Sequence, residues 1–406
     1  MSDRKFTIAT SPHVHSKETT PQIMLWVCIA LLPACAWGVY SFGYRAFLVL
    51  AVSVISCAAF EYACSRLLFG RSTLGDCSAL VTGLLVGMNL SAAVPLYIPI
   101  LASFFAIVVA KMTFGGLGQN FINPALAGRL FVFFSFTAAM SVFPQHKVWT
   151  NSGNISYPSS APYLQTSFDI SSASVTSASR VASDGHASSS SIALKPKEAD
   201  ARSIRQGVDA VTSASPLASY KSNPLSKKLN NLQYMEEIGY PYTRFAADIS
   251  GKIPISPYVI DAFFGFKNGC IGEISGLLLL VGAVILIARK LISYVIPVFY
   301  AGAYALLEWV FGGLVYGQGL FAGEPVFSLL TGGVLLCAIF MATDMVTSPV
   351  TKQGHMVYAV LLACMTFLIR RFSALPEGVS IALMLANIAT PTINRYCKRR
   401  VFGVAK

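Results

Sequence analysis

The segment DAVTSASPL at 209–217 places several hydroxyl side chains after an aspartate and before a proline. A serine or threonine hydroxyl can act as the attachment point of a group, so this spacing is that of a candidate covalent site. The same residue types are typical of a linker, and the stretch before the segment is serine-rich, with SSASVTSAS at 171–179. Composition alone leaves both interpretations open.

A second polar cluster lies in GGLGQNFINPALAGR at 115–129. It places the amides of Gln119, Asn120 and Asn123 among glycines and directly before Pro124. Amide groups and glycine-rich backbone where an apolar span begins can bind a ligand. They are equally typical of a turn that caps a helix, because Asn is a good N-cap and Pro a good first residue. Both interpretations stay open.

Carboxylates occur within or at the ends of apolar spans, at Glu61, Asp76, Glu308 and Asp344. Ionisable groups at membrane depth often mark ion pathways, so Asp76, Asp344 and Glu308 are candidates for one. A carboxylate that only anchors the end of a span at the interface is the alternative. The nine cysteines form no C-x-x-C pair, which favours packed apolar residues over a metal site or an iron–sulfur cluster. No catalytic residue is assigned.

The composition of the chain predicts that the fold that positions these side chains is that of a membrane protein. Of the 406 residues, 54% are hydrophobic and only 12% are charged, and the mean hydropathy is +0.61. A soluble domain carries roughly a quarter charged residues. The net charge of +12 does not indicate nucleic-acid binding, because the basic residues lie mostly at the ends of apolar spans, where they contact lipid and set the topology.

We therefore expect an all-α polytopic protein of about ten transmembrane helices. The predicted spans are 23–40, 46–64, 78–90, 95–109 and 124–143 in the first half, and 274–288, 292–310, 326–342, 356–369 and 378–389 in the second. Leu80-Val81-Thr82-Gly83 and Leu329-Leu330-Thr331-Gly332 occupy the same ordinal place in the two halves. Glycine-interrupted spans at corresponding positions indicate two five-helix inverted repeats with broken helices.

The predicted domain boundaries follow from these spans. An N-terminal tail at 1–21 and a C-terminal tail at 391–406 flank repeats at 22–143 and 257–390, which are separated by a large loop at 144–256. The serine-rich stretch at about 150–200 has little apolar content, so we expect it to be disordered or loosely held.

Positive residues of short loops favour the cytoplasm. With the N-terminus inside, the outer short loops contain only Arg45, Arg370 and Arg371 among the positive residues, and the other short loops and the tails hold many more. Both termini are then cytoplasmic, and the loop at 144–256, with Ser215, is extracytoplasmic.

The chain resembles a known family through six motifs in order. They are SPHVHSKETTPQIML, FGGLGQNFINPALAGR, DAVTSASPL, GCIGEISGLLLLVGA, MATDMVTSPVTKQG and NRYCKRRVFG. Together they are similar to the family of the D subunit of the Rnf electron-transport complex and the related B subunit of the sodium-pumping NADH:quinone reductase. The resemblance covers nearly the whole chain except the serine-rich stretch at about 150–200, which looks like an insertion. The short N-terminal tail is more like the Rnf version.

The resemblance implies FMN bound covalently through its phosphate to a hydroxyl side chain, a bond made by a flavin transferase that recognises roughly D-x-x-[ST]-G-A-[TS]. In this register Ser215 is the acceptor, and Asp209 and Thr212 are recognition residues. Two departures stand out: serine replaces the more usual threonine at 215, and Ser213 replaces glycine. The second leaves Ser213 or Thr212 open as the modified residue.

The resemblance further implies a membrane subunit of an ion-translocating ferredoxin:NAD⁺ oxidoreductase that relays electrons and is coupled to Na⁺ or H⁺ movement. Its partners are a second FMN-bearing subunit, an NAD-reactive subunit and membrane lipid in a bacterial inner membrane, with no nucleic acid. Gln119, Asn120 and Asn123 are candidates to hold a second, non-covalent flavin, riboflavin. The alternatives are the quinone reductase subunit, a non-redox channel or transporter of similar architecture, and a structural scaffold.

Overall fold

The structure, a computed structural model, describes residues 19–70, 72–144, 146–147, 155–156, 230–237, 240–314, 318–373 and 378–398. These residues are largely helical. Among them the only strand pairing joins β1 (Ile155–Ser156) to β2 (Tyr242–Thr243) in an antiparallel pair. The prediction of an all-α chain of apolar helices is confirmed.

The first half is a series of helices joined by short connections. They are α1 (Thr20–Phe42), α2 (Tyr44–Phe69), the single turn η1 (Leu74–Asp76), α3 (Ser78–Met88), α4 (Tyr97–Phe104) with its π-helical continuation η2 (Phe105–Met112), α5 (Pro124–Ser135) and α6 (Thr137–Met140). The helix predicted at 124–143 is shorter than expected. It stops at Ser135 because the Thr137 hydroxyl donates to the Phe133 carbonyl at 3.0 Å and competes with the helical backbone bond.

The last part of the large loop forms two small helices, and the helices of the second half follow. They are α11 (Asn231–Glu237), α12 (Arg244–Ser250), α13 (Pro257–Phe264), α14 (Gly276–Ala288), α15 (Val295–Phe311), α16 (Pro325–Leu330), α17 (Val334–Leu336) with its π-helical continuation η6 (Cys337–Met341), α18 (Lys352–Phe372) and α19 (Val379–Tyr396).

Three of the described helices, α1, α2 and α18, are long and apolar enough to cross a bilayer. Five more apolar segments are 10–17 residues long. Large hydrophobic side chains on α2 and α15, such as Phe47, Ile55 and Leu306, are exposed, as expected for residues that face lipid.

The two glycine-containing spans differ in a way that the sequence did not predict. Gly83 lies inside α3, which is continuous at this residue. A Cβ there would lie 2.6 Å from the Val54 Cα, so the glycine lets the backbones of α3 and α2 approach each other. Gly332 and Gly333 have φ of 65° and 72°, left-handed values that end α16 and start α17. Only the second of these spans is therefore broken.

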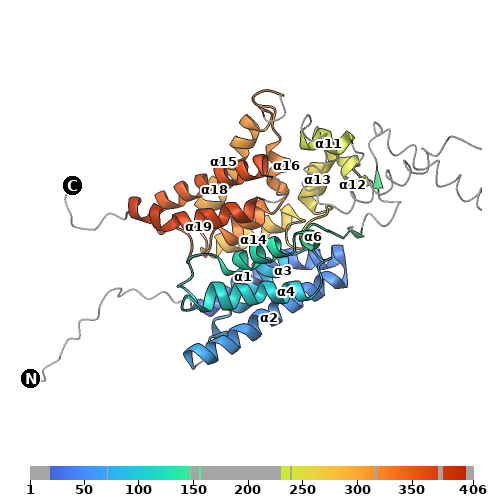
Figure 1. Ribbon diagram of the computed structural model, residues 1–406. Helices are drawn as coiled ribbons and strands as arrows, with labels where there is room; N and C mark the ends of the chain where they lie inside the picture. Colours follow the sequence, from blue (N-terminus) through green and yellow to red (C-terminus); the bar gives the residue numbers. More distant parts are fainter. Residues whose placement is uncertain are drawn as a thin grey trace, which may run out of the picture.

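The helices of the two halves lie side by side (Figure 1), with α1 against α14 and α5 against α19. The small elements α11, α12 and α13 gather at the right-hand end of the molecule, whereas the C-terminal end of α19 lies at the left. The last part of the large loop, with α11 and α12, is thus at the opposite end of the helices from the end of α19.

Candidate functional site

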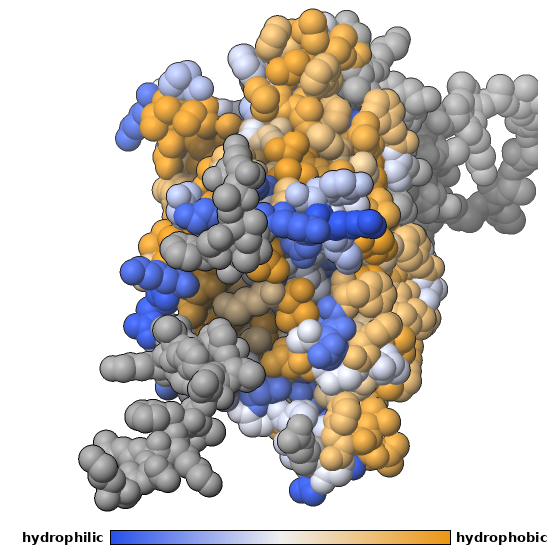
Figure 2. Space-filling model, turned by 90° about the vertical axis from the view of Figure 1, so that its left-hand side faces the viewer, coloured by the Kyte–Doolittle hydropathy of each residue, from blue (hydrophilic) through white to orange (hydrophobic). Residues whose placement is uncertain are grey.

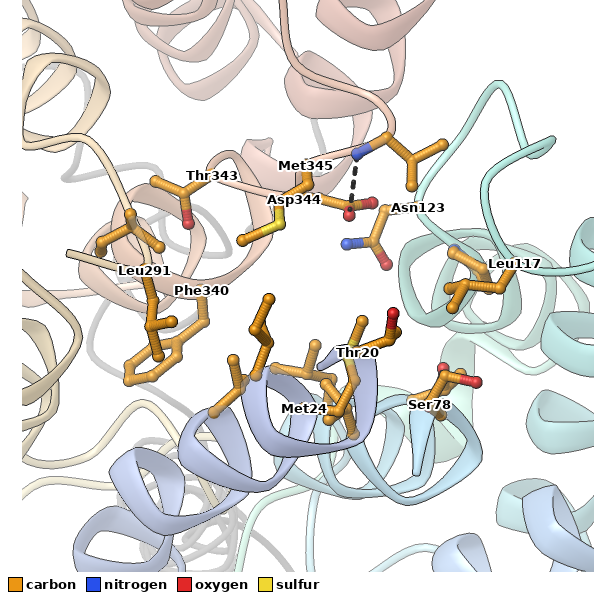
Figure 3. A pocket seen from close by; sticks show the side chains of 18 of the residues that line it. Thr20, Met24, Ser78, Leu117, Asn123, Leu291, Phe340, Thr343, Asp344 and Met345 are labelled. Carbon is orange, nitrogen blue, oxygen red and sulfur yellow. Dashed lines mark hydrogen bonds between the residues drawn. The ribbon is translucent and has the colours of Figure 1, made fainter. Parts of the chain in front are cut away.

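A cavity of about 250 Å³ lies between the two halves, at the end where α1 starts. Figure 2 looks onto this end and shows a hollow bordered by hydrophilic residues, with hydrophobic residues over the sides. The walls come from α1, α3, the start of α5, the end of α14 and the segment 339–346. Figure 3 shows Thr20, Asn123 and Asp344 pointing into it. The cavity has apolar walls and a few polar groups, as is typical of small-molecule sites.

The amide cluster supports both interpretations left open above, because Asn123 caps a helix and Asn120 is available to a ligand. The Asn123 side chain caps α5 by accepting from Ala125 N at 3.0 Å and Leu126 N at 3.4 Å. Asn120 donates to the Ile122 carbonyl at 3.1 Å, but its buried Oδ1 has no hydrogen-bond partner. Asn120 and Asn123 both line the cavity, whereas Gln119 is exposed and does not. A buried carbonyl oxygen without a donor costs free energy, so Asn120 is suited to a ligand that donates.

Gly115, Gly116 and Gly118 precede these amides with positive φ between 93° and 107°. Such backbone is strained for any other residue type, and it turns the chain back from η2 toward α5. The glycines therefore set the path of this loop, and with it the positions of Asn120 and Asn123 in the cavity wall.

The two predicted aspartates make mainly local contacts. Asp344 lines the cavity and accepts from Val346 N at 3.3 Å and the Thr347 hydroxyl at 3.2 Å. Asp76 accepts from the backbone N of Ser78 at 2.9 Å and from its hydroxyl at 2.6 Å, just before α3 begins. Both serve as turn-capping groups, and Asp344 also contributes a carboxyl group to the cavity wall.

A buried ion pair borders the cavity. Lys111, on η2, donates to the Glu61 carboxylate on α2 at 2.6 Å, and the two side chains are 2% and 0% exposed. The same carboxylate accepts from the Thr73 hydroxyl at 3.1 Å. The Ser78 hydroxyl, which donates to Asp76, lies 3.4 Å from the Glu61 carboxylate and accepts from Lys111 at 2.5 Å. Lys111 did not emerge from the sequence as a site residue, although a lysine inside an apolar run is a signal for one.

A second buried carboxylate, Glu308 on α15, has a matching environment. It accepts from the Ser328 hydroxyl on α16 at 2.9 Å and forms an ion pair with Arg371 on α18. The sequence predicts a span that ends at residue 369 and places Arg370 and Arg371 in the short loop after it, and this placement in a loop is wrong. Both belong to the last turn of α18, and their side chains turn into the protein.

Arg370 holds the break between α16 and α17. Its guanidinium donates to the carbonyl oxygens of Ser328 at 2.9 Å, Thr331 at 2.7 Å and Gly332 at 2.8 Å. It also donates to the Tyr304 hydroxyl at 2.9 Å, and Lys267 donates to the Leu330 carbonyl. A helix that ends inside a membrane leaves carbonyls without partners. Two cationic side chains satisfy them here.

A further polar group lies at the contact between the halves. Arg129, on α5, donates to the Asn89 side chain at 2.8 Å and to the Cys270 sulfur at 3.8 Å. The chain around Cys270 pairs with the end of α3, through Ile271 N to the Leu90 carbonyl at 3.0 Å. The motif GCIGE is thus part of the contact between the halves.

The last part of the large loop, residues 230–256, is bound to the second half through two carboxylates. Glu324 accepts from Leu232 N at 2.8 Å, and burial raises the pKa of this carboxyl to about 7. Asp261 accepts from Thr243 N at 2.8 Å, and burial raises the pKa of its carboxyl to about 6. The Asn230 side chain donates to the Ala322 carbonyl at 2.7 Å. These bonds hold α11 and β2 in place.

The residues of the candidate attachment segment, Asp209, Thr212, Ser213 and Ser215, lie outside the residues that the structure describes. Within the described ranges, no group of three or more His, Cys, Asp or Glu side chains is arranged to hold a metal ion.

Comparison with known proteins decides the family. A profile of the NQR2, RnfD, RnfE family matches residues 7–403. The chain belongs to this family. The D subunit of the Na⁺-translocating ferredoxin:NAD⁺ oxidoreductase complex of Acetobacterium woodii is 34% identical, over 100% of this chain and 98% of the relative.

Other members of the NQR2, RnfD, RnfE family are similar over nearly their whole length. The D subunit of the proton-translocating ferredoxin:NAD⁺ oxidoreductase complex of Clostridium ljungdahlii is 34% identical, over 99% of this chain and 97% of the relative. The D subunit of the ion-translocating oxidoreductase complex of Pectobacterium atrosepticum is 31% identical, over 98% of this chain and 99% of the relative. The resemblance proposed from the motifs is confirmed. The sequence identity does not distinguish between Na⁺ and protons as the transported ion, because the relatives named for Na⁺ and for protons are equally similar to this chain.

Proposed function

We propose that the chain is the membrane subunit of an ion-translocating ferredoxin:NAD⁺ oxidoreductase complex of the Rnf type. The observation that carries the proposal is the match along the whole chain to the D subunits of such complexes, which are named as redox-driven translocases. The apolar helices support a multi-pass position in a bacterial inner membrane. The B subunit of a sodium-pumping quinone reductase and a non-redox channel are the less supported alternatives, because the relatives named above are all D subunits.

In this proposal Ser215 carries FMN through a phosphoester, within the Asp209–Ser215 motif that a flavin transferase reads. A flavin exchanges one or two electrons, so it can connect one-electron carriers with NAD⁺. The chain's own contribution is to position the attachment segment. The bonds of Glu324 to Leu232 and of Asp261 to Thr243 support this role, since they fix the chain that follows Ser215.

We assign a second, non-covalent flavin such as riboflavin to the cavity between the halves. The volume of about 250 Å³ is just below the range of about 300–1,000 Å³ that is typical of ligand pockets. Asn120 offers an acceptor without a partner, and Asn123 and Asp344 are among the other polar residues of the wall. We assign Asn120 to binding, Asn123 to both capping and binding, and no role in this cavity to Gln119.

The inverted repeat is also part of the proposal. Glu61 and Glu308 support it, since each lies on the second apolar span of its half, next to a serine of the third span and a basic residue at the end of the fourth. With both termini cytoplasmic, the loop that carries Ser215 is extracytoplasmic. Electrons from a cytoplasmic donor then cross the membrane to this protein and return through the partner subunits to NAD⁺.

In-gel fluorescence tests the central point. A band of this chain that fluoresces after denaturing electrophoresis is the expected result, and a dark band from cells that contain the transferase rejects covalent flavin. For the orientation, an impermeant thiol reagent on intact cells should label a cysteine introduced at Ser190 and spare one introduced at Lys406. The reverse labelling pattern rejects the proposed topology.

A further inference from the structure

Residues 244–253, which are α12 and the turn that follows it, form a helical stretch on the surface (the surface helix). The helical spacing continues past the end of α12, because Ile253 N donates to the Ile249 carbonyl at 3.0 Å, four residues earlier. Residues four apart in this stretch therefore lie on the same face. The side chains of the surface helix can thus be assigned to faces from their spacing.

One face of the surface helix is apolar and exposed. It consists of Phe245, Ile249 and Ile253, which follow one another at intervals of four residues. Phe245 is 48% exposed, Ile253 is 47% exposed, and Ile249 is half-buried. On another side of the helix Ala246 is fully buried against the protein. Contiguous apolar side chains on a surface mark an interaction site, so this face is expected to be covered.

The neighbouring face of the surface helix is charged. Arg244, Asp248 and Lys252 also follow one another at intervals of four residues, and all three are exposed. Within the described part of the chain, neither Arg244 nor Lys252 forms an ion pair with a carboxylate. Two cations and one carboxylate give the face an excess of one positive charge. An apolar face next to a basic polar face is typical of helices that lie in the plane of a membrane interface.

The surface helix lies at the level where membrane spans end. It is beside α13 (Figure 1), and Phe245 packs edge-on against Phe264 of α13 with ring centroids 5.3 Å apart. The end of α13 contacts the last part of α1, where the Trp37 indole N donates to the Gly265 carbonyl at 3.2 Å. The ring of Trp37 lies 5.4 Å from that of Tyr40, which is 59% exposed. Trp and Tyr are enriched at the membrane–water interface, so this pair indicates the boundary of the bilayer.

The mixture of side chains favours lipid over a protein partner as the cover. Each residue of the apolar face has a charged neighbour directly before it in the sequence. The core of a protein–protein interface is depleted of charged residues, so such alternation suits it poorly. A phospholipid supplies both kinds of partner at one depth, because its phosphate lies directly above its acyl chains. The excess positive charge favours an anionic phospholipid.

We propose that the surface helix lies on the bilayer and binds anionic phospholipid. Phe245 and Ile253 enter the upper part of the acyl chains, and Arg244 and Lys252 contact lipid phosphates. The last part of the large loop is then held by the membrane as well as by its hydrogen bonds to the second half. The inference goes beyond the proposed function, because this contact requires neither flavin nor electron transfer.

Photo-crosslinking tests the contact with lipid. The photoreactive residue p-benzoylphenylalanine replaces Phe245, Ile253 or Asp248, one at a time, and the purified complex is reconstituted with phospholipid that carries tritium in its acyl chains. After irradiation we expect this chain to be radioactive when the probe is at 245 or 253. The probe at 248, on the charged face, should give about tenfold less label, which corresponds to a preference for water of about 1.4 kcal/mol. Crosslinks from 245 and 253 to another subunit or within this chain, no label at either position, or equal label at 248 would each overturn the proposal.

The preference for anionic lipid is measured with the probe at Phe245. In vesicles of equal parts phosphatidylglycerol and phosphatidylcholine, with tritium in one lipid at a time, the net charge predicts about fivefold more label from phosphatidylglycerol, which corresponds to about 1 kcal/mol. Arg244→Gln combined with Lys252→Gln should remove the preference. Arg289→Gln, a surface arginine over Trp26, is the matched loss of charge and should keep it.

Equal label from the two lipids with both cations present overturns the assignment of an anionic lipid, as does a preference that survives the double substitution. If the double variant does not assemble, the comparison of positions 245, 253 and 248 still decides whether lipid covers the apolar face. None of these outcomes depends on flavin attachment, so they remain distinct from a failure of the proposed function.

Discussion

Glu61 and Glu308 lie in matching surroundings in the two halves of the chain. Each carboxylate is buried, each lies next to a serine hydroxyl of the third span of its half, and each pairs with a cation, Lys111 or Arg371. The serine oxygens lie 3.4 Å from Glu61 and 2.9 Å from Glu308. The two pairs differ in the helix that supplies the serine, which is continuous for Glu61 and broken for Glu308.

Removing one member of the Glu61–Lys111 pair should be far more harmful than removing both. Lys111→Met leaves a buried carboxylate without its cation, and we expect a loss of about 3–5 kcal/mol of stability. The double variant Glu61→Gln, Lys111→Met should recover most of this loss. Thermal unfolding of the two variants and of Glu61→Gln completes the double-mutant cycle. Equal losses in the single and double variants would show that the pair does not compensate charge.

The attachment site is tested by replacing single hydroxyls. Ser215→Ala should remove the fluorescent band while the chain stays in the membrane, because the predicted loop lies outside the spans. Ser213→Ala is the matched control and should keep the band. Fluorescence that persists in Ser215→Ala and disappears in Ser213→Ala would place the attachment two residues earlier.

The cavity makes a prediction about non-covalent flavin. Asn120→Leu removes the buried oxygen that has no partner and should reduce the non-covalent flavin released by acid from the purified complex by about tenfold, the effect of losing one to two hydrogen bonds. Gln119→Leu, an exposed neighbour, should leave the flavin content unchanged. The covalent band is measured in parallel and should be the same in both variants. If both variants lose equal flavin, the loop as a whole, and not Asn120, is responsible.

The attachment of α11 should depend on pH. The pKa of Glu324 is raised by burial from 4.5 to about 7, so the docked state binds more protons than a detached state in this range. Docking is thus strongest at low pH and weakens as the pH rises from about 4.5 through about 7. Hydrogen exchange of residues 231–237, corrected for the intrinsic pH dependence, should show this loss of protection.

Glu324→Gln is the matched variant for this measurement. The amide has no charge to lose and can still accept from Leu232 N, so its protection should vary less with pH over the same window. The remaining dependence should follow Asp261, whose pKa is raised to about 6. An unchanged pH profile in Glu324→Gln would mean that another group controls the docking.

The apolar helices were predictable because hydropathy and helix length are local properties of the chain. The break at Gly332 and Gly333 was predictable in part, since glycine favours left-handed backbone. The sequence did not predict that α3 is continuous. Gly83 follows the same Leu-x-Thr pattern as Gly332, but in the structure it is a contact residue of α3, against the backbone of Val54.

The candidate site shows the same division. Asn123 followed by Pro124 predicts a capped helix start, and the structure has it. The partners of Glu61 and Glu308 come from helices distant in the chain, so no spacing rule could pair them with Lys111 and Arg371. Arg370 and Arg371 follow an apolar run and look like loop residues in the sequence.

The sequence by itself determined the membrane class, the helical elements, the family and the candidate attachment segment. These depend on composition, on local periodicity and on motifs that are recognised by their sequence and by their order along the chain. Only the tertiary structure decided which charges compensate each other, which asparagine has an oxygen without a partner, and which of two similar glycine spans is broken. Buried charges and polar atoms are stable only with partners, and the partners are chosen by how distant helices pack.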